Sequence, residues 1–215
     1  MRSVRFASGE FYHLFNRGVD KRKIFLRRSH YKRFVETIRR LLQTGSATPG
    51  PIPLDKKKAL KSKLNFTCYC LMPNHYHVLV RQLDENGITE FMHKLNTSYT
   101  KYFNFAHKRT GRLFEYTFQA VHIKTDEQLL HVSRYIHLNP IVGNITRSLR
   151  GYSFSSYPEY LGLVRDGLCR SEEILGFFRE GSAKKAYQRF VMDQADYAKR
   201  LHEIEKLTFD EIKPG

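Results

Sequence analysis

The chain has 215 residues, of which 41% are hydrophobic, and it carries 37 lysines and arginines against 21 aspartates and glutamates. This length and composition allow one sizeable buried core, and the net charge of +16 indicates a polyanionic partner such as a nucleic acid. No apolar run approaches the roughly 18 residues of a membrane span. The first residues lack the apolar stretch of a signal peptide, so we expect a cytoplasmic protein without a membrane segment.

The basic side chains are concentrated in the first third of the chain. Residues 1–63 hold 17 basic and 4 acidic side chains, whereas residues 151–215 hold 10 and 11. We therefore expect the first third to face a nucleic acid, with phosphate contacts made from two basic turns. The predicted contact residues are Arg17, Lys21, Arg22, Lys23, Arg109 and Arg112.

The first elements are predicted from alternating and helical apolar periodicity. Residues 10–17 alternate as a strand and lead into a turn at residues 16–18, and a helix is expected over residues 30–43 with Ser29 as its N-cap. Residues 44–63 break both periodicities and predict a loop. Three arginines of the helix lie off its apolar stripe and belong either to a solvated face or to a DNA-binding surface: Arg33, Arg39 and Arg40.

The middle of the chain predicts most of a sheet. Strands over residues 65–71 and 75–81 form a tight hairpin, which we expect at the centre of an antiparallel sheet. A helix over residues 88–107 and a fourth strand over residues 113–124 follow. The three cysteines are too few and wrongly spaced for a disulfide framework or a zinc knuckle, so we expect small buried apolar residues at Cys68, Cys70 and Cys169.

The last predicted helix of the main domain begins at Asp126 as N-cap and ends near Asn139, because Pro140 cannot continue it. Residues 151–215 contain aromatic clusters and two helical stretches, at residues 172–178 and 183–202. We expect a main domain over residues 1–150 and a C-terminal extension packed on it.

The strand at residues 75–81 carries two histidines on one face. His75 and His77 are two residues apart, so their side chains lie roughly 6–7 Å apart along the strand. Both imidazoles can tilt toward one metal ion, although two histidines on a strand can also be ordinary polar residues that face water. Downstream, the segment Tyr135–Pro140 offers a phenol and, on the same side of the helix one turn later, the amide of Asn139.

These motifs together resemble those of a known family. His75-Tyr-His77 after the segment Cys70–Asn74, with Tyr135–Pro140 downstream, is similar to the single-tyrosine HUH transposases, and most similar to their REP-associated branch. Further matching segments, in the same order as in that family, are Phe15–Gly18, Arg109–Phe114 and Gly151–Tyr157.

The resemblance implies a mechanism and a fold. It implies that Tyr135 is the nucleophile and that His75, His77 and Asn139 bind Mg²⁺ or Mn²⁺ as cofactor. Asn139 stands where transposases of autonomous insertion sequences usually have glutamine, a departure that fits the REP-associated branch. The implied fold is α+β and ferredoxin-like, with an antiparallel sheet of four to five strands and helices mainly on one face.

Three functions agree with this sequence. The first is metal-dependent nicking and strand transfer of single-stranded DNA at hairpin-forming palindromes through a 5′-phosphotyrosine. The second is a non-catalytic protein that binds hairpin DNA, and the third is a metal-dependent phosphodiesterase that uses water and does not need Tyr135. The expected partner is single-stranded or hairpin DNA, and the protein can be a monomer or a homodimer. His131 is the next candidate ligand, and His137 is expected to be structural or to contact DNA.

Overall fold

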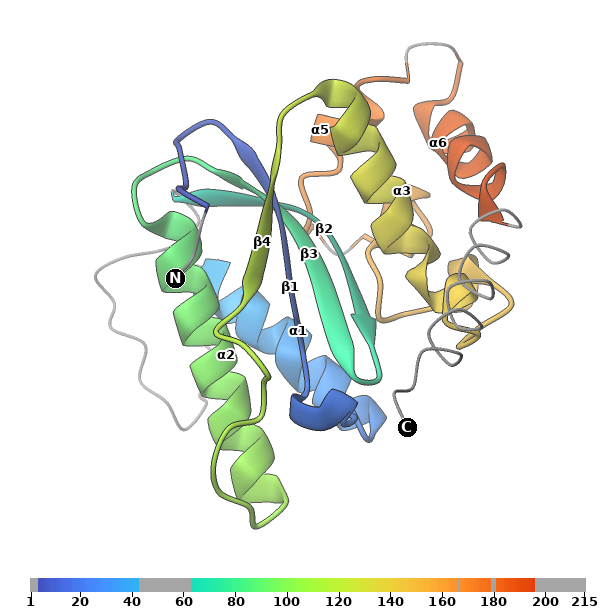
Figure 1. Cartoon of the computed structure of the whole chain (residues 1–215). Coiled ribbons are helices and arrows are strands. Elements are labelled where there is room, and N and C mark those ends of the chain that lie inside the picture. The colour runs from blue at the N-terminus through green and yellow to red at the C-terminus, as the bar shows by residue number, and fades with distance from the viewer. Residues whose placement is uncertain (1–3, 43–62, 166, 179–180, 196–215) are drawn as a thin grey trace, which may run out of the picture.

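The structure, a computed structural model, describes residues 4–42, 63–165, 167–178 and 181–195. Four antiparallel strands form one sheet in the order β2-β3-β1-β4 (Figure 1). The strands are β1 (Phe11–Arg17), β2 (Leu64–Met72), β3 (His75–Gln82) and β4 (Gln119–Ile123). The predicted α+β class with an antiparallel sheet is confirmed.

The predicted hairpin is present, but it is not the centre of the sheet. β3 lies inside the sheet between β2 and β1, whereas β2 has a strand on one side only. The pairing of β1 with β3 sets Arg17 opposite His75 and Phe15 opposite His77. The centre of the sheet is thus the pair formed by β1 and β3, which no local pattern identifies because the two strands are far apart in the sequence.

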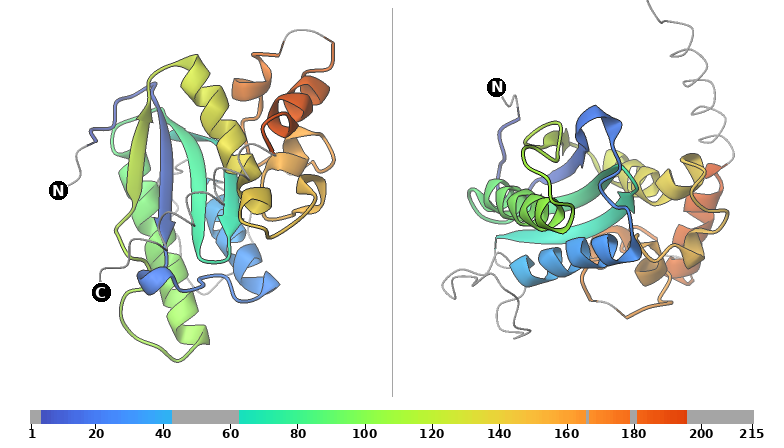
Figure 2. Two further views of the ribbon diagram at one scale, coloured as in Figure 1. Left: turned by 45° about the vertical axis from the view of Figure 1, so that its right-hand side comes forward. Right: turned by 90° about the horizontal axis from the view of Figure 1, so that it is seen from below.

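Two long helices cover one face of the sheet. α1 (Arg28–Leu42) and α2 (Gly87–Ala106) run side by side along it (Figure 2). The Phe34 ring of α1 lies 5.0 Å from the rings of both Tyr76 on β3 and Tyr99 on α2. Tyr76 and Tyr99 are fully buried, so this layer contains much of the aromatic core.

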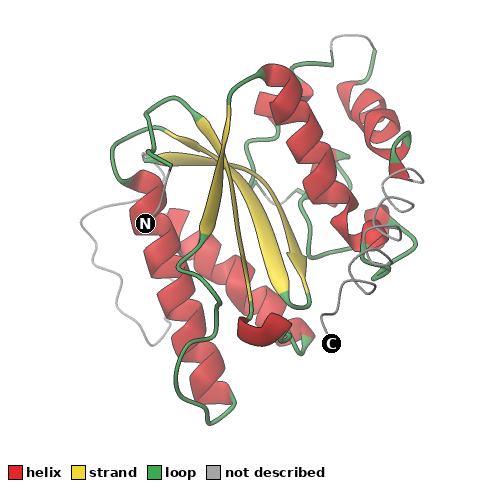
Figure 3. Cartoon of the chain, in the orientation of Figure 1, coloured by secondary structure: helices red, strands yellow, loops and turns green. Residues whose placement is uncertain are grey.

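The other face carries α3 (Asp126–Val142), which packs on β2 and β3. Beyond it lie the short elements η3 (Leu149–Gly151), α4 (Tyr157–Tyr160), α5 (Glu172–Leu175) and α6 (Ala183–Met192). Figure 3 shows α3, α5 and α6 on the β2 side of the molecule, away from α2. A short 3-10 turn, η1 (Val19–Lys21), follows β1.

The chain after η3 covers the free edge of β2. The backbone N–H of Leu71 donates to the Phe154 carbonyl at 2.9 Å, and the N–H of Ser156 donates to the Tyr69 carbonyl at 3.0 Å. The Tyr152 hydroxyl adds a bond to the Leu71 carbonyl at 2.6 Å. An uncovered edge strand invites pairing with other chains, and this segment prevents that pairing. The division into residues 1–150 and 151–215 stays a prediction.

Several predicted helix caps and helix ends were wrong. α1 begins at Arg28, so Ser29 lies inside the helix and is not its N-cap. α3 is capped by Thr125, whose hydroxyl oxygen accepts from the Gln128 N–H at 3.1 Å, and not by Asp126. Thr125 with Gln128 three residues on is the pair typical of a capping box, which places the cap one residue earlier.

Pro140 does not end α3, which continues to Val142. Its ring nitrogen has no hydrogen, so one bond of the helical ladder is missing near the C-terminus. The Gly143 N–H donates to the Asn139 carbonyl at 2.8 Å, and the Ile145 N–H donates to the Pro140 carbonyl at 2.8 Å. These bonds satisfy the carbonyls of the last turn, so the helix tolerates the proline.

Other predictions differ in length or fall outside the described residues. The fourth strand covers only residues 119–123 of the expected 113–124, because Phe114 forms an isolated bridge with Gly18 and the chain between is irregular. The loop predicted at residues 44–63 lies outside the described residues except for Lys63. All three cysteines are buried and free, as expected. No helix of the described residues is long and apolar enough to cross a membrane.

Candidate active site

The two histidines of β3 lie on the face of the sheet that α3 covers. Their ring centroids are 5.0 Å apart and their planes are nearly perpendicular, at 85°. His77 is 6% exposed and His75 is half-buried. The strand alternation thus places both rings under α3, while Tyr76 between them points into the aromatic core.

One nitrogen of each ring is engaged by a neighbour. His75 Nδ1 lies 2.7 Å from the Asn74 side-chain oxygen, and His77 Nδ1 lies 2.9 Å from His13 Nε2. A ring nitrogen in a hydrogen bond fixes the ring orientation and leaves the other nitrogen for a ligand. The two Nε2 atoms are therefore the nitrogens that these contacts leave for a metal ion.

Burial keeps both imidazoles neutral. It lowers the pKa of His77 well below its usual value, and the neighbouring His13 and His75 lower it further. Burial is also the main cause of the lowered pKa of His75, with a hydrogen bond to Asn139 opposing it and the Arg17 charge adding to it. A neutral imidazole is the form that binds a metal ion.

Helix α3 brings Tyr135 to this pair. The Tyr135 ring is 52% exposed, and its centroid lies 5.4 Å from that of His77 and 6.1 Å from that of His13, edge-on in both cases. Tyr135 lies in the middle of α3, since the helix runs to Val142. Its phenol is accessible from solvent beside a buried histidine cluster.

Asn139 lies one turn further along α3 and is 9% exposed. Its Nδ2 donates to the Tyr135 carbonyl at 2.9 Å, and its side chain also hydrogen-bonds to His75. This contact raises the pKa of His75, against the lowering by burial, so the Asn139 amide lies beside the imidazole. The structure thus groups His75, His77, Tyr135 and Asn139.

The other two histidines of α3 lie elsewhere. His131 is exposed and lies beside Arg134 and the Phe190 ring of α6, whose centroid is 6.1 Å away. His137 is fully buried, and its two nitrogens lie 2.8 Å from the Tyr187 hydroxyl and the Ser156 hydroxyl. His137 is therefore a structural residue, which is one of the two roles expected for it.

The grouped residues fit a divalent ion that also binds a phosphate. Among the described residues no three His, Cys, Asp or Glu side chains are arranged to hold a metal ion. A third protein ligand would then be a different side chain, and the Asn139 oxygen beside His75 is suited to this. Two neutral nitrogens and one amide oxygen are too few to fill the coordination sphere of a divalent ion, and the remaining positions are free for phosphate oxygens.

Residues 52–139 match the protein-family model described as "Transposase IS200 like". The match covers less than half of the chain and agrees with the resemblance of its motifs to those of the single-tyrosine transposases. The comparison with curated proteins gave no significant match.

Two solved structures are similar to this chain. One is described as a REP-associated tyrosine transposase bound to a REP hairpin; it is 14% identical, with 78% of this chain and 88% of that chain covered and a TM-score of 0.56. The other, a candidate transposase from Deinococcus radiodurans R1, is 15% identical, with 63% and 95% covered and a TM-score of 0.39. The first shows that the fold is shared.

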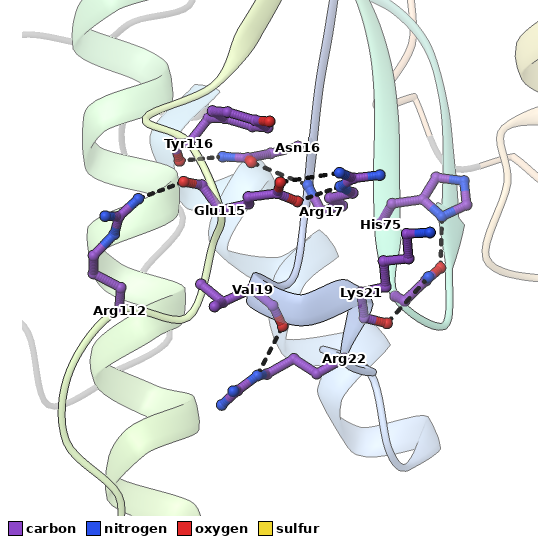
Figure 4. A network of polar contacts seen from close by, with 10 residues as sticks. Asn16, Arg17, Val19, Lys21, Arg22, His75, Arg112, Glu115 and Tyr116 are labelled. Atoms are coloured by element: carbon purple, nitrogen blue, oxygen red, sulfur yellow. Dashed lines mark hydrogen bonds and ion pairs between the residues drawn. The ribbon is translucent and has the colours of Figure 1, made fainter. Parts of the chain in front are cut away.

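The arginines predicted to contact DNA are largely engaged within the protein (Figure 4). Arg17 forms a two-bond ion pair with Glu115, in which Nη2 donates to Oε1 at 2.9 Å. Arg22 Nε donates to the Val19 carbonyl at 2.9 Å, and Arg112 donates to the Glu115 carbonyl. Arg109 donates to Asn104 at 2.7 Å.

These contacts change how the basic turns are interpreted. The charge of Arg17 is balanced by Glu115, although Arg17 lies beside His75 across the strand pair. Lys21 and Lys23 are exposed, and the Lys21 carbonyl accepts a bond from Asn74. The turn at residues 17–22 therefore supports the histidine face, and its role in DNA binding stays a prediction.

The sequence alone did not identify His13. It lies on β1, is 8% exposed, and stacks on His77 with ring centroids 5.1 Å apart. Its alternation with Phe15 places it on one face of its strand, but only the pairing of β1 with β3 shows that this face is the one that carries His77.

Proposed function

We propose that this protein is a transposase of the IS200-like type, a single-tyrosine DNA endonuclease that nicks and rejoins single-stranded DNA at hairpin-forming palindromes. The observation that carries the proposal is the position of Tyr135, half-exposed and edge-on to His77 at 5.4 Å. A phenol that served packing alone would be expected inside the core, as Tyr76 and Tyr99 are.

The reaction is a transesterification. The Tyr135 oxygen attacks the phosphorus of a phosphodiester, and the bond from phosphorus to the 3′ oxygen breaks. The phenol gives its proton to water, the leaving oxygen takes one up, and the products are a 5′-phosphotyrosine and a free 3′-hydroxyl. One ester replaces another, so the step is reversible and the same protein can rejoin strands.

The phenol needs help, because its ordinary pKa near 10 makes it a weak nucleophile at neutral pH. His75, His77 and Asn139 would hold a divalent ion, Mg²⁺ or Mn²⁺, which when bound withdraws charge from the phosphate and orients it. The Nδ1 atoms of His75 and His77 contact Asn74 and His13, respectively, and these contacts hold the two imidazoles in place. The helix fixes Tyr135 relative to Asn139 through the bond from Nδ2 to the Tyr135 carbonyl.

The proposed substrate is a palindrome that folds into a hairpin. It is suggested by the similar structure that holds a REP hairpin, and by Asn139, which fits the REP-associated pattern. The net charge of +16 supports a nucleic-acid substrate. An exposed tyrosine beside two histidines favours cleavage of the hairpin over binding alone.

The test is cleavage of an end-labelled single-stranded hairpin with its flanking sequence. Cleavage should need Mg²⁺ or Mn²⁺, stop in EDTA, and fall at least tenfold in His77→Ala, about 1.4 kcal/mol in the barrier. His131→Ala is the matched control, because this histidine lies toward Phe190, and it should cleave normally. Full cleavage in EDTA, or in His77→Ala, contradicts the proposal.

A further inference from the structure

Two of the arginines expected to contact DNA are already paired with carboxylates of the protein itself, so cations elsewhere on the surface are further candidates for phosphate contacts. Arg17 is paired with Glu115, and Arg22 with Asp20 at 3.1 Å. An ion pair already formed reduces what a cation gains from a phosphate. Cations without a carboxylate partner are the stronger candidates.

Such cations occur on the outward side of α1. Arg28 and Lys32 are exposed and form no ion pair with a described residue. By contrast, Arg39 and Arg40, further along the helix, lie 4.0 Å and 3.2 Å from the Glu36 carboxylate. Like charges left unpaired on one helix repel each other, which is a cost unless an anion binds there.

Aromatic rings, and not carboxylates, hold two of these arginines. The Arg28 guanidinium carbon lies 5.7 Å above the Phe154 ring, and the Arg33 guanidinium carbon lies 5.3 Å above the Tyr102 ring. The buried Arg33 Nε has no hydrogen-bond partner among the described residues. A ring beneath a guanidinium orients it and leaves its charge uncompensated.

The surface is hollowed at this place. A depression of about 670 Å³ lies over α1, lined by Arg28, Lys32, Arg33 and Phe154 among others. A second hollow of about 360 Å³ adjoins it, lined by Arg150 and Arg165, and both hollows are lined by Tyr69 and Ser153. We call the two together the β2-edge groove, since Tyr69 belongs to β2.

We propose that the β2-edge groove binds the sugar-phosphate backbone of a duplex DNA stem; this rests on the proposed function, because the stem is that of the hairpin substrate. Cations stand on both walls: Arg28, Lys32 and Arg33 on α1, and Arg150 and Arg165 on the chain after α3. The Phe154 ring stacks on Tyr31 at 3.9 Å and lies beneath Arg28. With its ring covered in this way, no base can stack on it, so the groove suits a phosphate backbone and not a single strand with splayed bases.

The groove also adjoins the structure behind the active site. The segment that separates it from α3 contains Ser156, which lines the groove and hydrogen-bonds to His137. A stem in the groove therefore lies along the outer edge of β2. The chain segment that contains Ser156 separates this stem from α3. This also gives the chain after α3 a role beyond covering the strand edge.

The test compares two triple variants of equal charge. The groove variant is Arg28→Gln, Lys32→Gln and Arg150→Gln, and the control is Lys101→Gln, Lys124→Gln and Lys185→Gln, three exposed lysines outside the groove. The probe is a labelled hairpin of scrambled sequence, since backbone contacts carry no sequence information. Affinity is measured at several salt concentrations, and thermal melting checks that each variant is folded.

For the groove variant we expect the slope of log affinity against log salt to fall by about two to three units, and the control to change by less than about one. Affinity for a stemless single strand should not change in the groove variant. Arg28→Lys, which keeps the charge, should retain the wild-type slope.

Three results would overturn the inference: parallel salt lines for wild type and groove variant, an equal loss in the control, or an equal loss on the stemless strand. The last would mean that the groove holds single-stranded DNA. Failure of the proposed function would look different. The groove variant would still lose binding to the stem, but the wild-type protein would cleave none of the strands.

Discussion

At the scale of single residues, the candidate site depends on a contact between two histidines of different strands. His13 Nε2 lies 2.9 Å from His77 Nδ1, and both rings are buried. If His77 binds a metal ion through Nε2, its Nδ1 carries the hydrogen and donates to His13. His13 is then a positioning residue, which selects the tautomer of His77 and its ring orientation.

We expect His13→Ala to weaken Mn²⁺ binding by roughly tenfold to a hundredfold, the usual effect of losing such a partner. Isothermal titration with Mn²⁺ measures this without any DNA. His13→Gln, whose side-chain oxygen can accept the same hydrogen, should recover part of the affinity. His93→Ala, an exposed histidine on α2, is the control. Wild-type Mn²⁺ affinity in His13→Ala would show that His13 only fills space.

Strand alternation placed His75 and His77 on one face, and the resemblance to single-tyrosine transposases singled out Tyr135 and Asn139. The sequence did not reveal His13, whose contact depends on the pairing of β1 with β3. It also did not show that Arg17 is paired with Glu115, which is close to it only after folding. Residues whose partners are distant in sequence are those that local rules miss.

At the scale of elements, α3 joins the candidate site to the chain that follows it. One side of α3 carries Tyr135, and another carries His137, which lies against Tyr187 of α6 and Ser156. Burial lowers the pKa of His137 to about 3. A neutral imidazole at this position therefore connects α3 to both neighbours.

Stability should fall as the pH falls below about 6.5, the ordinary pKa of histidine. Between this pH and about 3, the unfolded chain binds a proton at His137 that the folded chain does not, so the free energy of unfolding decreases. Other buried histidines add to the effect, so the measurement is the difference between wild type and His137→Gln. In EDTA, the variant should be less stable at pH 7.5 and lose less stability toward pH 4.5. Equal losses would contradict a neutral, buried His137.

The elements themselves follow from periodicity, but their ends do not. Apolar spacing predicts α1, α2 and α3 to within a few residues. The continuation of α3 through Pro140 was missed, since the bonds that complete its last turn come from Ile145 and Thr146 beyond it. The fourth strand is shorter than predicted, because Phe114 pairs with Gly18 and does not continue the hydrogen-bond ladder of β4.

At the scale of the whole molecule, the chain after residue 150 completes the sheet. It covers the free edge of β2 through Tyr152, Phe154 and Ser156. Tyr69, Cys70 and Leu71 of that edge are buried in its presence. The sequence predicted an extension packed on the main domain, but nothing local indicated that it would lie along a strand edge.

A chain that ends at residue 150 should lose cooperative thermal unfolding and aggregate, because a hydrophobic strand edge becomes exposed. Light scattering and thermal melting measure this. A milder variant, Tyr152→Phe, removes only the hydroxyl that bonds to the Leu71 carbonyl, and should cost about 1 kcal/mol. A truncated chain that stays monomeric with the wild-type melting temperature would show that residues 1–150 fold without this cover.

Tyr135 as the nucleophile is tested most directly by trapping the covalent intermediate. Wild-type protein, Mn²⁺ and a hairpin with its flanking strand should give a DNA adduct that survives SDS, with mass spectrometry locating the phosphate on Tyr135. Tyr135→Phe should form no adduct and should bind the hairpin as tightly as wild type. Tyr116→Phe, which alters another exposed tyrosine, should form the adduct normally. Undiminished adduct or undiminished cleavage in Tyr135→Phe would contradict the proposed mechanism.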